Sequence, residues 1–150
     1  MRIGRIAALL AVITATVGLA PPAQAAETWL LKNQWNNGCL DYNPTNGVHT
    51  RACNGGPWQQ WQFIRYGDGT IRFLNVATKM CLDASEKGVR GWGCNELPYQ
   101  RWRLEWLSTG DFRLFSRWDN RCLDNSEKGV RTWGCNVLPY QRWYQVETPL

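Results

Sequence analysis

The chain has 150 residues, a formal net charge of +5 and ten tryptophans. This length suits a leader followed by one domain of ordinary size. Its arginines are spread along the sequence, whereas nucleic-acid binding usually needs a dense basic stripe, so we expect no nucleic-acid partner.

The first 25 residues have the pattern of a secretory signal peptide. Arg2 and Arg5 supply a positive start, residues 6–19 are an apolar run, and Ala23-Gln24-Ala25 fits the rule for cleavage between small residues. The apolar run is shorter than the roughly 20 residues of a membrane span. We therefore expect a signal peptide over 1–25 and a secreted, extracellular chain over 26–150, with a charge of +3 (5 − 2) and no membrane insertion.

One 22-residue stretch occurs twice, with an offset of 41 residues. Residues 81–102 and 122–143 are identical at 19 of the 22 positions, and a more diverged third copy opens at Cys39 and closes at Trp61. Self-similarity at a fixed period indicates a repeat architecture. The sequence therefore predicts three repeats of about 41 residues, at about 28–69, 70–110 and 111–150.

Each repeat reads as four short strands. Apolar residues alternate, as at Ile71 and Phe73, and Gly- and Asn-rich clusters separate the segments, while no segment shows helical periodicity. A four-stranded unit this short cannot bury its apolar face alone, but three units can close around a shared axis. We predict an all-β fold, a β-trefoil of 12 short strands. Its core is expected to contain the recurring Trp61, Trp102 and Trp143.

The six cysteines fall two to a repeat. An even number of cysteines in a small secreted domain indicates disulfides, and the repeat pattern selects one pairing of the fifteen that are possible. The predicted pairs are Cys39–Cys53, Cys81–Cys94 and Cys122–Cys135. A zinc site would need clustered cysteine and histidine, and His49 is the only histidine. We expect neither a metal nor another cofactor.

A Gln-x-Trp motif closes each repeat and follows a Cys-Leu-Asp triplet, at Gln59–Trp61, Gln100–Trp102 and Gln141–Trp143. Three such motifs, in register with three cysteine pairs, resemble the ricin B-type (R-type) lectin family. The resemblance covers the whole of 26–150. It implies a β-trefoil domain that binds glycans or polysaccharides in a shallow pocket on each repeat.

The resemblance also implies site residues. In small bacterial lectins of this family, an Asp after the first cysteine, an Asn and two Tyr hold the sugar; in the ricin-like subgroup, a stacking aromatic stands two residues before the second cysteine. The matching positions are Asp41, Asp83 and Asp124; Asn54, Asn95 and Asn136; Trp58, Tyr99 and Tyr140; and the stacking residues Trp92 and Trp133, with Arg51 in the first repeat. The other Tyr is replaced by His49, Arg90 and Arg131. Because the chain mixes features of two subgroups, neither supplies the identity of the sugar.

The residue types fit sugar chemistry without the family. A carboxylate and an amide bind hydroxyl groups, and an aromatic ring packs on the apolar C–H face. Arg90 and Arg131 add planar guanidinium donors suited to an acidic group, so we expect the second and third repeats to tolerate or prefer acidic sugars. We expect the first repeat, with His49, Arg51 and Trp58, to be the weakest site.

Other interpretations remain open at this stage. The Asp and Asn side chains also serve as turn formers, and the Tyr rings as packing residues. Catalysis is not expected, because threefold symmetry separates the three Asp carboxylates and no base–nucleophile pair is evident. The rival function is protein binding, as a protease inhibitor or toxin-delivery subunit, since a fold does not fix a function. Any separate protein partner is unknown from the sequence.

Overall fold

The computed structural model describes residues 27–148, and the signal peptide expected over 1–25 lies outside them. The described residues form twelve strands and two short 3-10 helices. The strands are β1 (Thr28–Asn33), β2 (Cys39–Asn43), β3 (Gly47–Arg51), β4 (Trp61–Arg65), β5 (Ile71–Asn75), β6 (Cys81–Ser85), β7 (Gly88–Trp92), β8 (Trp102–Trp106), β9 (Phe112–Ser116), β10 (Cys122–Ser126), β11 (Gly129–Trp133) and β12 (Trp143–Glu147). The helices are η1 (Pro98–Gln100) and η2 (Pro139–Gln141).

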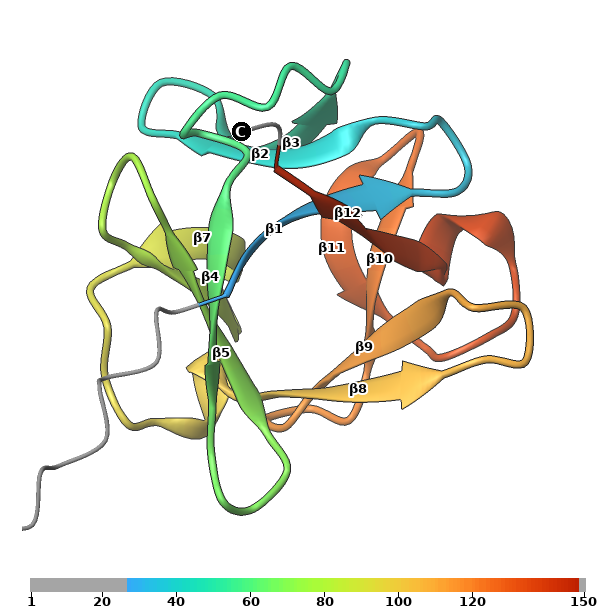
Figure 1. Cartoon of the computed structure of the whole chain (residues 1–150). Helices are drawn as coiled ribbons and strands as arrows, with labels where there is room; N and C mark the ends of the chain where they lie inside the picture. The colour runs from blue at the N-terminus through green and yellow to red at the C-terminus, as the bar shows by residue number, and fades with distance from the viewer. Residues whose placement is uncertain (1–26, 149–150) are drawn as a thin grey trace, which may run out of the picture.

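Six of the strands close into a barrel. Antiparallel pairing runs from β1 to β4, β5, β8, β9 and β12 and returns to β1, and these strands surround the centre of Figure 1. The other six strands form three hairpins, β2–β3, β6–β7 and β10–β11. One hairpin belongs to each repeat, so the predicted β-trefoil is confirmed.

The three recurring tryptophans fill the barrel, as predicted. Trp61, Trp102 and Trp143 are fully buried. The indole Nε1 of each donates to a leucine carbonyl of its own repeat, at 3.0, 3.1 and 3.0 Å. A buried indole N–H needs such a partner, and the bond also ties the barrel to the hairpin of that repeat.

The glutamine of each Gln-x-Trp motif is a structural residue. Gln100 is fully buried; its Oε1 accepts from the backbone N–H of Asn95 at 2.9 Å, and its Nε2 donates to the carbonyl of Gly93 at 3.0 Å. Gln59 and Gln141 make equivalent contacts. The motif therefore fixes the loop that follows the second cysteine of each repeat.

The three predicted disulfides are confirmed, one in each repeat. Each joins the first strand of a hairpin to the loop beyond it, with Cα atoms 5.0 to 5.1 Å apart. Among residues 27–148, no group of three or more His, Cys, Asp or Glu side chains is placed to hold a metal ion. Over the same range, none of the helices has the length and apolar character needed to cross a membrane.

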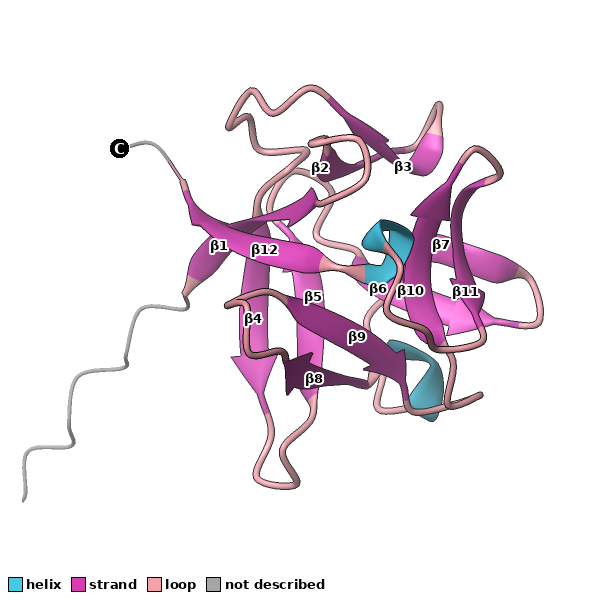
Figure 2. Ribbon diagram, turned by 90° about the vertical axis from the view of Figure 1, so that its right-hand side faces the viewer, coloured by secondary structure: helices cyan, strands magenta, loops and turns pink. Residues whose placement is uncertain are grey.

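The three hairpins meet at one end of the molecule, where β3, β7 and β11 contact one another (Figure 2). Tyr42 packs on Gly91 so closely that a Cβ there would lie 2.2 Å from the ring, and Thr50 Oγ1 donates to Asn125 Oδ1 at 3.2 Å. The two near-identical stretches differ at three positions, and two of these are here: 84 against 125 and 91 against 132. Those sequence differences therefore belong to packing between repeats.

Candidate carbohydrate-binding sites

The carboxylate of the second repeat lies beneath an arginine. Strand pairing places Asp83 of β6 opposite Arg90 of β7. Arg90 Nε donates to Asp83 Oδ1 at 3.1 Å, and Gln100 Nε2 donates to Oδ2 at 3.2 Å. Asp83 is only 1% exposed. Both of its oxygens are therefore bound by protein side chains, which a buried carboxylate requires.

The tryptophan of this repeat faces solvent. Trp92 ends β7 and is 51% exposed, and the Arg90 guanidinium carbon lies 4.1 Å from the centroid of its ring. Val89 packs on the core, so residues alternate between two faces of the strand as the sequence indicated. An exposed indole beside a charged guanidinium offers one apolar surface and several hydrogen-bond donors.

The third repeat reproduces this geometry. Arg131 Nε donates to Asp124 Oδ1 at 3.2 Å, and Gln141 Nε2 donates to Oδ2 at 3.1 Å. The Arg131 guanidinium lies 4.2 Å from the ring of Trp133, which is 50% exposed. The second and third repeats thus present two matching arrangements of carboxylate, guanidinium and indole.

One basic residue distinguishes the third repeat. Arg121 and Arg131 line a hollow of about 400 Å³ together with Trp118, and Arg121 also lines a hollow of about 270 Å³ beside Trp133. The second repeat has Met80 at the position of Arg121. Glu86 and Asp119 line the larger hollow as well, so Arg121 adds a hydrogen-bond donor there without giving the hollow a net positive charge.

The first repeat has no arginine over its carboxylate, although Asp41 is as buried as Asp83 and Asp124. Asn43 Nδ2 donates to Asp41 Oδ1 at 3.2 Å, and His49 Nε2 lies 3.7 Å from the same oxygen. Asp41, Asn43, Arg51 and the exposed Trp58 line a hollow of about 330 Å³, together with three residues of the turn after β2. We expected the first repeat to be the weakest site, and that ranking stays a prediction.

The three predicted asparagines form turns. Asn95 Oδ1 accepts from the backbone N–H of Leu97 at 2.9 Å, and Asn136 Oδ1 does the same from Leu138. Asn54 Oδ1 accepts from the N–H of Gly56 at 2.8 Å. Their amide oxygens therefore have the turn-forming role that the sequence left open beside sugar binding.

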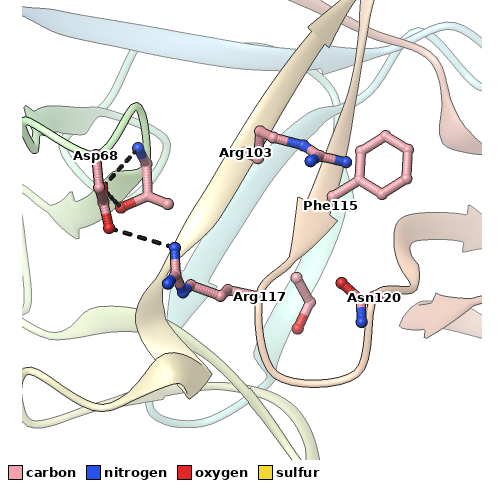
Figure 3. Close-up of a pocket in the computed structure, with 7 residues that line it drawn as sticks. Asp68, Arg103, Phe115, Arg117 and Asn120 are labelled. Atoms are coloured by element: carbon pink, nitrogen blue, oxygen red, sulfur yellow. Dashed lines mark hydrogen bonds and ion pairs between the residues drawn. The ribbon is translucent and has the colours of Figure 1, made fainter.

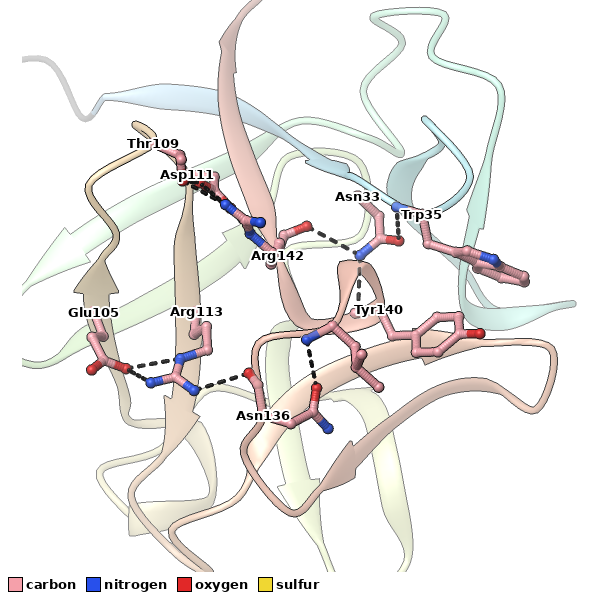
Figure 4. Close-up of polar contacts among 10 residues, drawn as sticks. Asn33, Trp35, Glu105, Thr109, Asp111, Arg113, Asn136, Tyr140 and Arg142 are labelled. Atoms are coloured by element: carbon pink, nitrogen blue, oxygen red, sulfur yellow. Dashed lines mark hydrogen bonds and ion pairs between the residues drawn. The ribbon is translucent and has the colours of Figure 1, made fainter.

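Two tyrosines pair with tryptophans that the sequence analysis did not single out. The ring centroid of Tyr99 in η1 lies 5.4 Å from that of Trp118, and the ring centroid of Tyr140 in η2 lies 5.2 Å from that of Trp35. Figure 4 shows the rings of Tyr140 and Trp35 side by side. Trp35 and Trp118 are 40% and 37% exposed. They occupy equivalent positions in the first and third repeats, where the second repeat has Ala77. This recurrence could have identified both tryptophans from the sequence.

The family of the chain is shown by its sequence. Residues 27–147 match the family model described as the ricin-type beta-trefoil lectin domain. The chain therefore belongs to the ricin-type β-trefoil lectin family, in agreement with the resemblance carried by its Gln-x-Trp motifs. A comparison with curated proteins gives no significant match.

Solved structures support the same fold. The designed threefold symmetric protein ThreeFoil is 22% identical with a TM-score of 0.75, over 80% of this chain and 98% of that one. A ricin B-like lectin from Macrolepiota procera, solved with lactose, is 16% identical with a TM-score of 0.70, over 85% and 99%. The hemolytic lectin CEL-III is 28% identical with a TM-score of 0.67, over 80% of this chain and only 30% of that one.

Proposed function

We propose that this protein is a secreted, non-catalytic lectin that binds glycans through its repeats. One observation carries the proposal: in a chain of the ricin-type lectin family, two near-identical repeats each expose an indole, Trp92 or Trp133, beside a guanidinium and a buried carboxylate. The indole supplies a surface for the C–H face of a sugar, and the guanidinium, held in place by the carboxylate, supplies donors for its polar oxygens.

Binding at a single repeat is expected to be weak, because each indole is exposed on an open surface. Three repeats on one rigid barrel engage several branches of one glycan, which raises the effective concentration after the first contact. The hollow beside Asp41 and Trp58 adds a third, differently shaped surface. Multivalent attachment is therefore the mechanism that we propose.

Acidic glycans are the proposed preference of the second and third repeats. Arg90 uses only its Nε toward Asp83, and none of the described residues accepts a hydrogen bond from its two terminal nitrogens. Those nitrogens form a fork that matches a carboxylate or sulfate. Arg131 has the same arrangement with Asp124.

The test is a glycan array on residues 26–150, followed by variants of the exposed indoles. Trp92→Ala with Trp133→Ala is expected to lower glycan affinity at least tenfold without unfolding, because both rings are half exposed. Trp106→Ala removes an indole that is 57% exposed and lies outside the candidate sites, and it serves as the matched control. Equal loss in the control, or no loss in the double variant, would reject these sites.

Protein binding is the competing function, and competition separates the two. Simple sugars are expected to release the protein from a polysaccharide resin if it is a lectin. Saturable binding to a protease that sugars leave unchanged would instead favour the inhibitor interpretation.

A further inference from the structure

A hollow of about 360 Å³ lies among strands that belong to none of the candidate carbohydrate-binding sites. It is bounded by the β4–β5 turn, the start of β8, the end of β9 and the loop after β9. Asp68, Arg103, Ser116, Arg117 and Asn120 contribute side chains to it. In Figure 3 the guanidinium of Arg103 points toward Phe115, and that of Arg117 points toward Asp68.

A sequence difference between the repeats falls at this hollow. The first and second repeats have asparagines at the position of Ser116, and these amides donate across the fold: Asn33 to the Tyr140 carbonyl at 3.1 Å, and Asn75 to the Trp58 carbonyl at 2.8 Å. Ser116 is shorter. It is 1% exposed, and its Oγ has no hydrogen-bond partner among the described residues. A buried hydroxyl without a partner is unfavourable, and a bound ligand would relieve it.

The charges around the hollow favour an anion. Asp68 Oδ2 is already paired, with Arg117 at 3.3 Å and Arg101 at 3.8 Å. Arg103 rests against the ring of Phe115, 4.8 Å from its centroid, and no carboxylate of the described residues lies within ion-pair distance of it. Two guanidinium groups thus pair with the carboxylate of Asp68, and the charge of Arg103 is not neutralised by an ion pair.

We propose that this hollow binds a carboxylate or sulfate group such as an acidic saccharide carries. The planar fork of Arg103 donates to the charged oxygens, and Ser116 Oγ donates to, or accepts from, a neighbouring ligand oxygen. Because the hollow shares no residue with the candidate sites on the repeats, this proposal does not depend on the proposed lectin sites.

The test is an NMR titration of residues 26–150 that follows the Arg103 side-chain Nε–H and the Ser116 backbone N–H. The ligands are D-glucuronate, N-acetylglucosamine 6-sulfate, inorganic sulfate and the neutral methyl glucoside. Saturable shifts with the three anions and none with the neutral sugar are expected. A saccharide at least tenfold tighter than sulfate identifies an acidic sugar as the ligand, and equal affinity identifies the oxyanion itself. Equal shifts with the neutral sugar would overturn the proposal.

Three variants complete the test. Ser116→Asn gives the third repeat the residue of the other two and places a larger side chain at the hollow, and Arg103→Gln removes its free charge. Each is expected to weaken anion binding at these signals at least tenfold. Arg65→Gln removes one positive charge from an exposed pair with Glu27 elsewhere and should change binding less than twofold. Unchanged binding in Arg103→Gln would refute the site even if Ser116→Asn failed to fold, while the indole signals of Trp92 and Trp133 report on the lectin sites separately.

Discussion

Arg90 contacts both groups that a sugar would use in the second repeat, since it donates to Asp83 and covers part of the Trp92 ring. A hydrogen bond between two charged groups is about twice as strong as a neutral one, so a neutral sugar hydroxyl competes poorly for this carboxylate. An acidic sugar need not compete, because it binds the unused side of the guanidinium. The side chain thus favours charged ligands over neutral ones.

A charge-removing variant tests this preference. Arg90→Gln with Arg131→Gln keeps a donor for each carboxylate but removes the positive charge, so affinity for acidic glycans is expected to fall about tenfold, equivalent to about 1.4 kcal/mol. Affinity for neutral glycans should stay level or rise. Arg90→Lys with Arg131→Lys keeps the charge without the fork and should be intermediate. Identical array profiles for all three proteins would exclude the preference.

Packing between the first two hairpins requires a glycine at position 91, because the Tyr42 ring occupies the space of a side chain there. Gly91→Ala would place a methyl group 2.2 Å from the Tyr42 ring, so unfolding in urea should show a loss of about 1–3 kcal/mol. Gly93→Ala, where a Cβ meets no atom within 4 Å, is the matched control and should be close to neutral. In a Tyr42→Ala background, the cost of Gly91→Ala is expected to disappear, and an undiminished cost there would show that the ring is not its cause.

An ion pair joins two barrel elements and makes stability depend on pH. Asp111, at the turn before β9, accepts hydrogen bonds from Arg142, which precedes β12, and these hold the pKa of the Asp111 carboxyl below its ordinary value of 3.8 (Figure 4). A lowered folded-state pKa means that the stabilisation is complete above the unfolded pKa and is lost as pH falls through the folded one.

Urea unfolding between pH 2 and pH 7 checks this pair. Asp111→Asn is expected to lower the free energy of unfolding by about 1.5–3 kcal/mol at pH 7 and to reduce the loss of stability on acidification below about pH 4. Asp119→Asn, an exchange at another Asp outside this pair, should retain the steep acid dependence of the wild type. If Asp111→Asn lost stability on acidification as steeply as the wild type, the pair would not be the source.

The barrel fixes three repeats in one rigid body, and this gives the molecule its avidity in the proposed function. Loss of one repeat site is expected to lower affinity for a monosaccharide modestly but to lower retention on a polysaccharide by a further 10- to 100-fold. Surface plasmon resonance with Trp92→Ala on dense and sparse glycan surfaces measures the difference. Equal losses on both surfaces would show that the repeats act independently.

The fold was predictable because the same strand pattern, core tryptophan and cysteine pair occur in each of the three repeats. Twelve strands, the buried Trp61, Trp102 and Trp143 and the disulfide pairing all follow from residues that recur in register. The covering of Asp83 by Arg90 was not predictable, because it depends on strand register and on which rotamer the arginine adopts. The hollow at Ser116 was missed for a related reason. Ser116 stands where the other two repeats have an asparagine, and the sequence analysis followed residues that recur rather than residues that are replaced.

The meeting of the three hairpins has a consequence for how this chain can be rearranged. Tyr42 packs on Gly91 in the following repeat, and Asn125 accepts a hydrogen bond from Thr50 in the repeat that follows it around the axis. Ala84 and Thr132 are the remaining residues at these two positions. The three junctions between neighbouring hairpins thus use three different pairs of residues. Placing the third copy directly after the first would set the Tyr42 ring against a threonine, and building a chain from the second copy three times would set alanine against glycine. The order of the duplicated segments is therefore itself encoded at this junction.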